Sequence, residues 1–312
     1  MKLYYYQDPE GKINFGDDLN PWIWGKLCPE LFDNNDNEIL VGIGTLLNNN
    51  IPKEPKKIVF STGVGYGDTK APPEIDSTWK FYCVRGPLSA KALNLPKEKS
   101  VIDGAYLLKN IIKDIPEKKF KFSYMPHFHY ANESYKNMCA KLGIHYIDPS
   151  QNIEKTLDEI LSTEILFSEA MHGAIVADCF NIPWVPIRTN NKILSFKLED
   201  WCQSIEIKYM PIDIKPLWNT KLTLLQKINH QYKVYKNIIL FKKLKQKGIK
   251  ATYNSDEKVL SSKIKILNSL VVLLSKSISA IRDIACLTFS SLILLKAAWY
   301  KGLRLSQIRY CL

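Results

Sequence analysis

The stretch ILFSEAMHGAIVADCFNIPWVPI, residues 165–187, contains the pattern that decides the fold. Ile165–Phe167 is a short apolar run typical of a buried strand, and the residues after it read as a helix that Pro183 closes. Trp184–Ile187 is the next apolar run. A strand, a helix and a second strand in this order indicate a crossover connection between neighbouring strands of a parallel sheet.

The same alternation recurs over the first 225 residues and predicts an α/β fold with two parallel sheets. We place the domains at residues 1–105 and 106–225. Ligands of such sheets bind beyond the carboxyl ends of the strands, so we expect the functional site in the cleft between the two domains. The predicted strands are Lys2–Tyr6, Glu38–Val41, Lys57–Phe60, Lys80–Val84, Phe120–Tyr124, Tyr146–Ile147, Ile165–Phe167 and Trp184–Ile187.

The positive charge of the chain is concentrated in its last part. The 312 residues carry a net charge of +12, and residues 226–312 hold 17 Lys and Arg against 3 Asp and Glu. The preceding 225 residues are close to neutral, with 26 basic and 28 acidic side chains. We therefore expect residues 226–312 to form a basic, amphipathic helical tail.

Apolar residues in this tail recur at alternating spacings of three and four, which predicts a long helix with a heptad-like stripe. The stripe consists of Ile264, Leu267, Val271, Leu274, Ile278 and Ile281. We favour packing of the stripe on the body of the protein or on a second copy of the chain. Packing on a second copy would give a homo-oligomer. The alternative is an anionic membrane surface, which would attract Lys242, Lys243, Lys245, Lys247 and Lys250. Nucleic acid is not an expected partner, because the basic cluster has few interleaved aromatic residues.

Cysteine and histidine usage argues against a disulfide framework and against a metal site. The seven cysteines are scattered without a CxxC pair. His127 and His129 supply two metal ligands at most, so no metal or cofactor is expected. The N-terminal sequence MKLYYYQDPEGK lacks the apolar core of a signal peptide. We therefore expect a cytoplasmic protein, which the tail could hold at the inner face of the cell membrane.

Two features at predicted strand ends could bind an anion. Gly63 and Gly65 follow the third strand, where backbone N–H groups could approach a ligand, although a tight turn without a ligand explains them as well. Arg85 follows the fourth strand and precedes a Gly-Pro step that suits a helix start. Its guanidinium and the N–H groups of that helix start favour a phosphate or carboxylate. The alternative is a surface arginine paired with Asp68 or Asp103.

The quoted stretch contains a candidate acid/base pair. Ser168 can cap the predicted helix, and Glu169 and His172 are three residues apart, so that the carboxylate could orient the imidazole. Gly173 would let a ligand approach this turn. A Glu–His pair at an exposed helix start is a plausible general acid/base. The alternative is a helix start with two solvated polar residues.

Several motifs in order lead to one resemblance. They are NFGD at residues 14–17, VRGPLS at 84–89, IDGA at 102–105, MPH at 125–127, SEAMHGAIVAD at 168–178 and LEDW at 198–201. From about residue 1 to residue 222, the chain resembles the polysaccharide pyruvyl transferase family. The variant at 169–173 is similar to the branch associated with exopolysaccharide and succinoglycan ketal formation.

The resemblance implies two Rossmann-like domains in a glycosyltransferase-B-like arrangement. It also implies a reaction that transfers a pyruvyl group from phosphoenolpyruvate to two hydroxyls of a sugar, with release of phosphate. We expect this sugar to be lipid-linked. Arg85 and His172 are then expected to contact phosphoenolpyruvate, and Asp17 or Asp18 to bind or deprotonate the acceptor. The matching motifs add Asn14, Gly16 and His127 to the substrate-binding residues.

One position departs from the family pattern. Many members have an arginine two residues before the histidine, where this chain has Ala170, so Arg188 or a lysine from elsewhere would have to supply the missing cation. Two other functions remain open from the residues alone. One is a nucleotide-sugar glycosyltransferase on the same architecture, although its usual Glu-x7-Glu signature is not evident. The other is a non-enzymatic protein that binds acidic glycans or a membrane.

Overall fold

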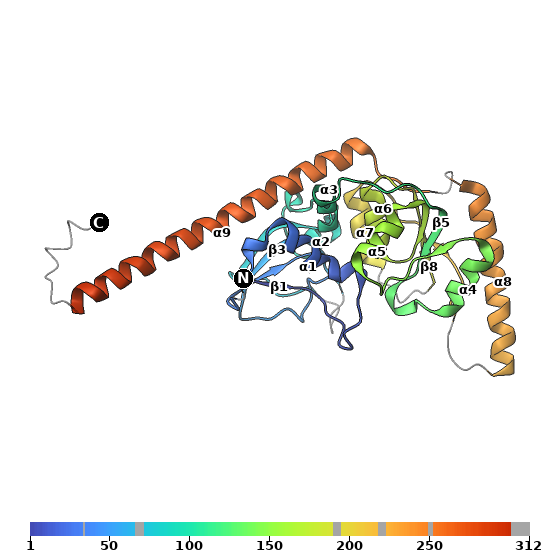
Figure 1. Ribbon diagram of the computed structural model, residues 1–312, viewed down its shortest axis with the longest axis horizontal. Coiled ribbons are helices and arrows are strands. Elements are labelled where there is room, and N and C mark those ends of the chain that lie inside the picture. The colour runs from blue at the N-terminus through green and yellow to red at the C-terminus, as the bar shows by residue number, and fades with distance from the viewer. Residues whose placement is uncertain (34, 66–71, 190–194, 218–222, 249–251, 301–312) are drawn as a thin grey trace. The chain divides into compact units, whose positions relative to one another are not determined.

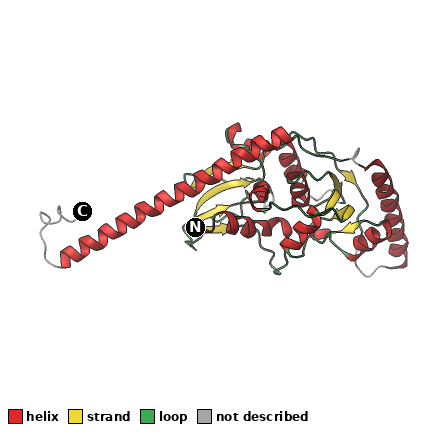
Figure 2. Cartoon of the chain, turned by 45° about the horizontal axis from the view of Figure 1, so that its top comes forward, coloured by secondary structure: helices red, strands yellow, loops and turns green. Residues whose placement is uncertain are grey.

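The computed structural model describes residues 1–33, 35–65, 72–189, 195–217, 223–248 and 252–300, and for residues 279–300 it describes the backbone alone. Met1–Asn268 forms one compact unit and Ser269–Leu312 a second. The first unit contains both predicted sheets, with helices packed around them (Figures 1 and 2). The predicted α/β fold with parallel sheets is therefore confirmed.

The first sheet has four parallel strands in the order β1-β2-β3-β4. Six of the seven residues of the inner strand β3 are buried, as expected for a parallel strand covered on both faces. The four predicted strands are all present; Glu38–Val41 has the predicted bounds, and the ends of the other three differ by at most two residues. Their bounds are β1 Lys2–Tyr4, β2 Glu38–Val41, β3 Lys56–Thr62 and β4 Trp79–Val84.

The second sheet has five parallel strands in the order β6-β5-β7-β8-β9. Four of them were expected, whereas the two-residue edge strand β9 has too few residues to show an apolar pattern. The bounds are β5 Phe120–Met125, β6 His145–Tyr146, β7 Thr163–Ser168, β8 Trp184–Arg188 and β9 Ile212–Asp213.

The connection after β7 differs from the prediction. Ser168 continues the strand by pairing with Met125 and Pro186, and the following helix begins only at Met171. The residue before that helix is Ala170, which makes no side-chain cap, and the Ser168 hydroxyl donates to the Ala170 carbonyl at 2.7 Å. The predicted capping role of Ser168 is therefore wrong.

The helices connect the strands and join the two halves of the first unit. α1 contacts α5 and α6, and α2 contacts α7. The α-helices are α1 Phe15–Leu27, α2 Pro87–Ala92, α3 Leu108–Ile111, α4 Glu133–Leu142, α5 Ile153–Leu161, α6 Met171–Cys179, α7 Ser195–Ser204, α8 Leu224–Lys247 and α9 Glu257–Tyr300. The 3-10 turns are η1 Pro29–Leu31, η2 Lys97–Lys99, η3 Gly104–Leu107 and η4 Phe128–Tyr130.

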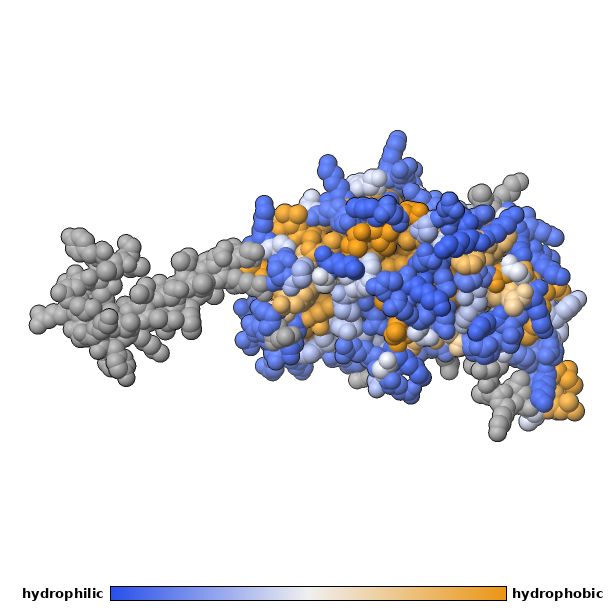
Figure 3. Space-filling view, viewed as in Figure 1, coloured by the Kyte–Doolittle hydropathy of each residue, from blue (hydrophilic) through white to orange (hydrophobic). Residues whose placement is uncertain are grey.

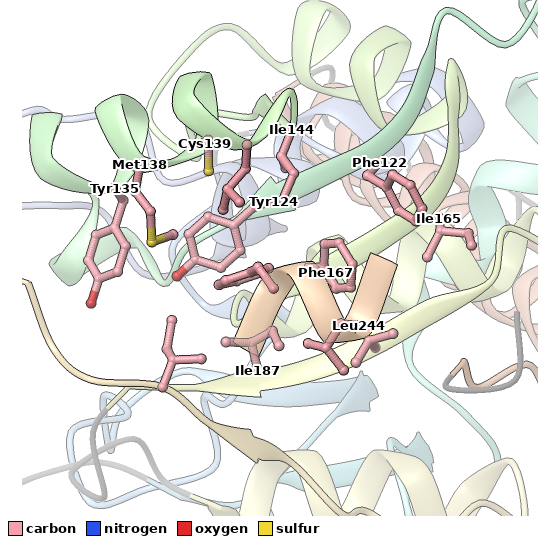
Figure 4. Packing of buried hydrophobic residues seen from close by; sticks show 14 of the residues in the cluster. Phe122, Tyr124, Tyr135, Met138, Cys139, Ile144, Ile165, Phe167, Ile187 and Leu244 are labelled. Carbon is pink, nitrogen blue, oxygen red and sulfur yellow. The ribbon is translucent and has the colours of Figure 1, made fainter. Parts of the chain in front are cut away.

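Part of the predicted tail contributes to the core of the second sheet. Phe241 and Leu244 of α8 are buried in one cluster with Tyr124 of β5 and Phe167 of β7 (Figure 4). The Phe241 ring makes edge contacts with both Tyr124 and Phe167, at centroid distances of 5.6 Å and 5.2 Å. Burial of such large rings stabilises the position of α8 against the sheet.

The predicted heptad-like stripe lies on the 44-residue helix α9. Leu267 is fully buried, and the side chain of the next residue, Asn268, donates a hydrogen bond to Asn110 at 3.3 Å. Lys250 and the side chain of Ile281, which we had also assigned to the tail, lie outside the described residues. Among the described residues, no helix combines the length and apolar character that a membrane span requires.

Candidate active site

A cavity of about 380 Å³ lies where strands of both sheets end. Its lining comes from the segments after β1, β2, β5 and β7, from the start of α1 and from α7. This is the place where ligands of parallel sheets bind, because the loops there carry free side chains and backbone groups. Of the ten site residues expected from the sequence, the lining includes Asn14, Gly16, Asp17, His127 and His172.

The start of α1 places a carboxyl group with an unusual pKa in the cavity. The Asn14 side-chain amide donates to Asp17 Oδ2 at 2.6 Å, and the backbone N–H of Asn14 donates to Asp18 at 2.8 Å. Burial raises the pKa of Asp17 to about 7, since the charge of Lys197 only partly opposes this effect. Asp17 can therefore bind or release a proton near neutral pH, as a general acid or base must.

His172 projects from the first turn of α6 toward the start of α1. A Cβ added to Gly16 would lie 2.2 Å from His172 Nδ1, so only glycine leaves room for the ring in this place. On the other side, His172 Nε2 lies 3.8 Å from Asp103 Oδ1. Burial, together with the charges of Lys197 and Arg85, lowers the pKa of His172 to about 3. The imidazole is therefore neutral at physiological pH.

Arg85 is fully buried and lies beneath the cavity lining. Its Nε donates to Asp200 at 3.1 Å, and its Nη1 donates to the Gly44 carbonyl at 3.0 Å and to the Thr45 hydroxyl at 2.9 Å. Gly44 and Thr45 both line the cavity. Arg85 thus supports the cavity wall in this structure, and the alternative of a surface arginine is wrong. Direct contact with a substrate remains a prediction.

The guanidinium still has unused donor capacity. Arg85 Nη2 has no hydrogen-bond partner among the described residues, and the same holds for Asp103 Oδ2 and His172 Nε2. Buried polar atoms without partners are costly and often belong to sites that act on a ligand. Asp68, the other partner considered for Arg85, lies outside the described residues.

The two predicted loop glycines serve local packing. A Cβ on Gly63 would lie 2.2 Å from Arg85 Nη2, so this glycine makes room for the guanidinium. Gly65 has a φ of +138°, which favours glycine, and its carbonyl accepts a hydrogen bond from the cavity residue Asn48 at 3.3 Å. Residues 66 and 67 of the same loop lie outside the described residues.

Glu169 and Gly173 lie outside the cavity lining. The Glu169 carboxylate accepts hydrogen bonds from the backbone N–H of His127 at 3.1 Å and of Thr189 at 2.6 Å, and also from the Thr189 hydroxyl. It holds the ends of β5 and β8 together, and the predicted pairing of Glu169 with His172 is wrong because Glu169 precedes the helix. Gly173 is not part of the cavity lining, and a Cβ on it would lie 2.6 Å from the sulfur of the lining residue Met125.

The sequence did not single out Lys197, which the structure places in the cavity lining together with Ala170 and His172. Lys197 lies in the first turn of α7 and is 8% exposed. Its charge lowers the pKa of Asp17, and it also lowers the pKa of His127, which burial brings to about 3. Arg188, the other cation considered, lies outside this lining and forms a paired hydrogen bond with Asp213 at 2.7 Å and 3.1 Å.

The chemistry of the lining suits an anionic ligand. Lys197 supplies the positive charge, since His127 and His172 are neutral, and Asp17 supplies a group that titrates near pH 7. The described residues contain no cluster of three or more His, Cys, Asp or Glu side chains able to hold a metal ion. The cavity thus combines a cation for binding with groups for proton transfer.

Comparison with known proteins agrees with the motifs and the fold. Residues 5–191 match the family model described as polysaccharide pyruvyl transferase. The chain is also 38% identical over 221 residues to the succinoglycan biosynthesis protein ExoV of Rhizobium meliloti (strain 1021), in an alignment that covers 68% of this chain and 67% of the relative. The chain therefore belongs to the polysaccharide pyruvyl transferase family and is a transferase.

Proposed function

We propose that this transferase moves the pyruvyl group of phosphoenolpyruvate onto two hydroxyls of a sugar and forms a cyclic pyruvate ketal. The observation that carries the proposal is the placement of Lys197, Asp17 and His172 in one cavity at the strand ends of both sheets. Phosphoenolpyruvate has a carboxylate and a phosphate, so a site for it needs a cation and polar donors. Lys197 and the Asn14 amide can meet that need.

In the proposed reaction, His172 is the acid. A donor that carries negative charge beside the imidazole favours its protonated form and raises the pKa of His172 from its value of about 3. The protonated imidazole then gives its proton to the methylene carbon of the donor. The neighbouring carbon becomes electron-poor and can be attacked by a sugar oxygen. Asp103, 3.8 Å from the ring, stabilises the imidazolium.

Asp17 is the base for the acceptor. Its pKa of about 7 leaves a large ionised fraction at neutral pH, which can take the proton of the attacking hydroxyl. A bond then forms between the sugar oxygen and the central carbon of the donor. The second hydroxyl attacks the same carbon as the phosphate leaves, and its proton goes to the released phosphate. One donor and two hydroxyls thus give one ketal and one phosphate.

The remaining residues position these groups. Arg85 and Gly63 support the wall at Gly44 and Thr45, and Gly16 seats the imidazole. Glu169 holds the backbone of His127 in place. We further propose that the two sheets form Rossmann-like domains, 1–105 and 106–225, in a glycosyltransferase-B-like arrangement. The shared cavity at their strand ends supports this assignment.

The acceptor is proposed to be a sugar of an exopolysaccharide in its lipid-linked form. The relative from Rhizobium meliloti is a succinoglycan biosynthesis protein, which supports a surface polysaccharide as the product. Phosphoenolpyruvate is a cytoplasmic metabolite, so the reaction would take place at the cytoplasmic face of the membrane. Such an acceptor would bring the protein to a lipid surface.

Phosphate release tests the proposal. The purified chain is incubated with a membrane extract that contains lipid-linked saccharides, and with either phosphoenolpyruvate or a UDP-sugar. Phosphate release that requires both phosphoenolpyruvate and the extract, together with an acid-labile pyruvate on the lipid fraction, is the expected result. Transfer of sugar from the UDP-sugar, without consumption of phosphoenolpyruvate, would show a glycosyltransferase instead.

A further inference from the structure

The first half of α8 exposes a stripe of large apolar side chains. Leu225, Ile228, Tyr232 and Tyr235 recur at spacings of three, four and three, so they lie on one face of the helix. Leu225 is 79% exposed, and Tyr232, the least exposed of the four, still has 54% of its surface accessible. Leu224 adds a further exposed side chain at the start of the helix. The surface is orange at the lower right of Figure 3, where Figure 1 draws the lower end of α8.

This apolar stripe is not the face by which the helix is attached to the protein. The attachment uses Asn237, Phe241 and Leu244, which are buried, and the Asn237 side chain exchanges two 2.8 Å hydrogen bonds with the backbone of Lys215. Val234 and Ile238 pack beside them. The helix therefore has two apolar faces, and the outward one is fixed in place by the inward one.

The charged side chains of α8 itself all have the same sign. α8 contains seven lysines and neither Asp nor Glu. Lys227, Lys233 and Lys236 lie among the stripe residues in the sequence, and Lys242 and Lys243 follow them toward the end of the helix. Lys236 also lies over the ring of Tyr232, with Nζ 5.4 Å from the ring centroid.

We propose that the first half of α8 docks on an anionic lipid surface. A helix with Leu, Ile and Tyr on one face and lysines at its flanks inserts the apolar side chains into the boundary between headgroups and acyl chains, while the lysines contact the anionic headgroups. A second copy of the chain fits less well, because it would bring seven further lysines to the same place. Docking through this surface agrees with a lipid-linked acceptor but does not depend on it.

Vesicle flotation tests the surface with matched variants of the full chain. The variant L225S/I228S/Y232S removes the stripe, and I75S/I115S/M210S replaces three exposed apolar residues elsewhere. We expect the wild type and the control to float with phosphatidylcholine vesicles that contain phosphatidylglycerol, and to float less at high salt. The fraction of the stripe variant that floats with these vesicles should be lower by about tenfold or more. No flotation of the wild type, or equal flotation of all three proteins, would overturn the proposal.

Hydrogen exchange locates the contact. Addition of the same vesicles should slow exchange of backbone amides at residues 223–236, and vesicles of phosphatidylcholine alone should have less effect. Slowed exchange confined to residues 269–312 would assign membrane binding to the other unit and refute the docking role of α8. A wild type that forms dimers without binding vesicles, and a stripe variant that is monomeric, would instead identify a second copy as the partner.

Vesicle binding through α8 and the proposed pyruvyl transfer can be tested separately. The stripe residues lie outside the cavity lining, so the stripe variant should keep wild-type phosphate release with a water-soluble acceptor fragment. Loss of vesicle binding with intact turnover supports the docking surface. Normal vesicle binding by a chain that does not consume phosphoenolpyruvate would refute the proposed function and leave the docking surface standing.

Discussion

His172 Nε2 and Asp103 Oδ1 lie 3.8 Å apart, although Asp103 follows the first sheet and His172 follows a strand of the second. The contact brings the two halves of the first unit together at the cavity. Burial raises the pKa of Asp103 to about 6, while the charge of Arg85 opposes the rise. This carboxyl therefore remains largely ionised at neutral pH and can stabilise a protonated imidazole.

Replacement of the imidazole tests its role as an acid. His172→Ala should lower kcat by roughly 10²-fold or more, because a positioned proton donor contributes about that factor. Steady-state phosphate release measures the change. His230→Ala on α8, outside the cavity lining, is the control and should behave as the wild type. A variant with unchanged kcat and a raised KM would make His172 a binding residue.

Removal of the cavity cation tests how the donor is held. Lys197→Met keeps the length of the side chain and should lower kcat/KM for phosphoenolpyruvate by roughly 10- to 100-fold, the usual effect of losing a charged hydrogen bond. Lys197→Arg should restore part of the loss. Lys91→Met on α2 removes an exposed lysine and serves as the control. Equal kinetic constants for Lys197→Met and the control would refute the binding role.

The activity should depend on pH through Asp17. A bound donor keeps His172 protonated, and a base acts in its ionised form, so kcat at saturating phosphoenolpyruvate is expected to rise as pH passes the Asp17 pKa of about 7. Asp17→Asn should have a low activity without this rise. A wild-type profile that is flat between pH 6 and 8 would exclude Asp17 as the base.

The same variant has a predicted effect on stability. The pKa of Asp17 is about 7 in the folded chain against 3.8 for an ordinary aspartate, so the folded state holds the proton more tightly. The wild type should therefore lose stability as pH rises from about 4 to 7, and Asp17→Asn should lose less. Tm measured against pH compares the two. Parallel curves would show that burial does not perturb this carboxyl.

Two glycines of α1 provide a matched pair. A Cβ on Gly16 would meet the imidazole of His172 at 2.2 Å, whereas a Cβ on Gly25 would meet nothing within 4 Å. Gly16→Ala should displace the ring and lower kcat by about tenfold or more. Gly25→Ala should keep the activity and stabilise the helix by up to about 1 kcal/mol. Equal kcat values for the two variants would show that catalysis does not depend on the space that Gly16 leaves for the His172 ring.

The alternation of strands and helices made the fold predictable, because burial of both sheet faces leaves apolar runs that a local reading detects. His172 was predictable because it lies four residues after a strand, whereas Asp17, 13 residues after β1, was expected only from the family motif NFGD. Lys197 was harder to recognise, because it directly precedes the LEDW motif at 198–201 but is not part of it. The alanine at position 170, where many family members have an arginine, indicated only that the cation must come from another residue.

Long-range pairing limited the remaining predictions. Arg85 meets Asp200 across 115 residues, and Glu169 meets Thr189 across 20, so no local spacing relates either pair. The pairing of Glu169 with His172 failed because the strand runs one residue beyond its apolar run. Helical periodicity applies only from Met171 onward. The inward face of α8 was not predictable for the same reason, because Phe241 and Leu244 pack against strands that are distant in the sequence.

A structure of the chain with phosphoenolpyruvate tests the central claim most directly. The account predicts the donor in the cavity, with Lys197 Nζ on one of its anionic groups and the His172 ring beside its methylene carbon. A donor bound elsewhere while this cavity stays empty would contradict it.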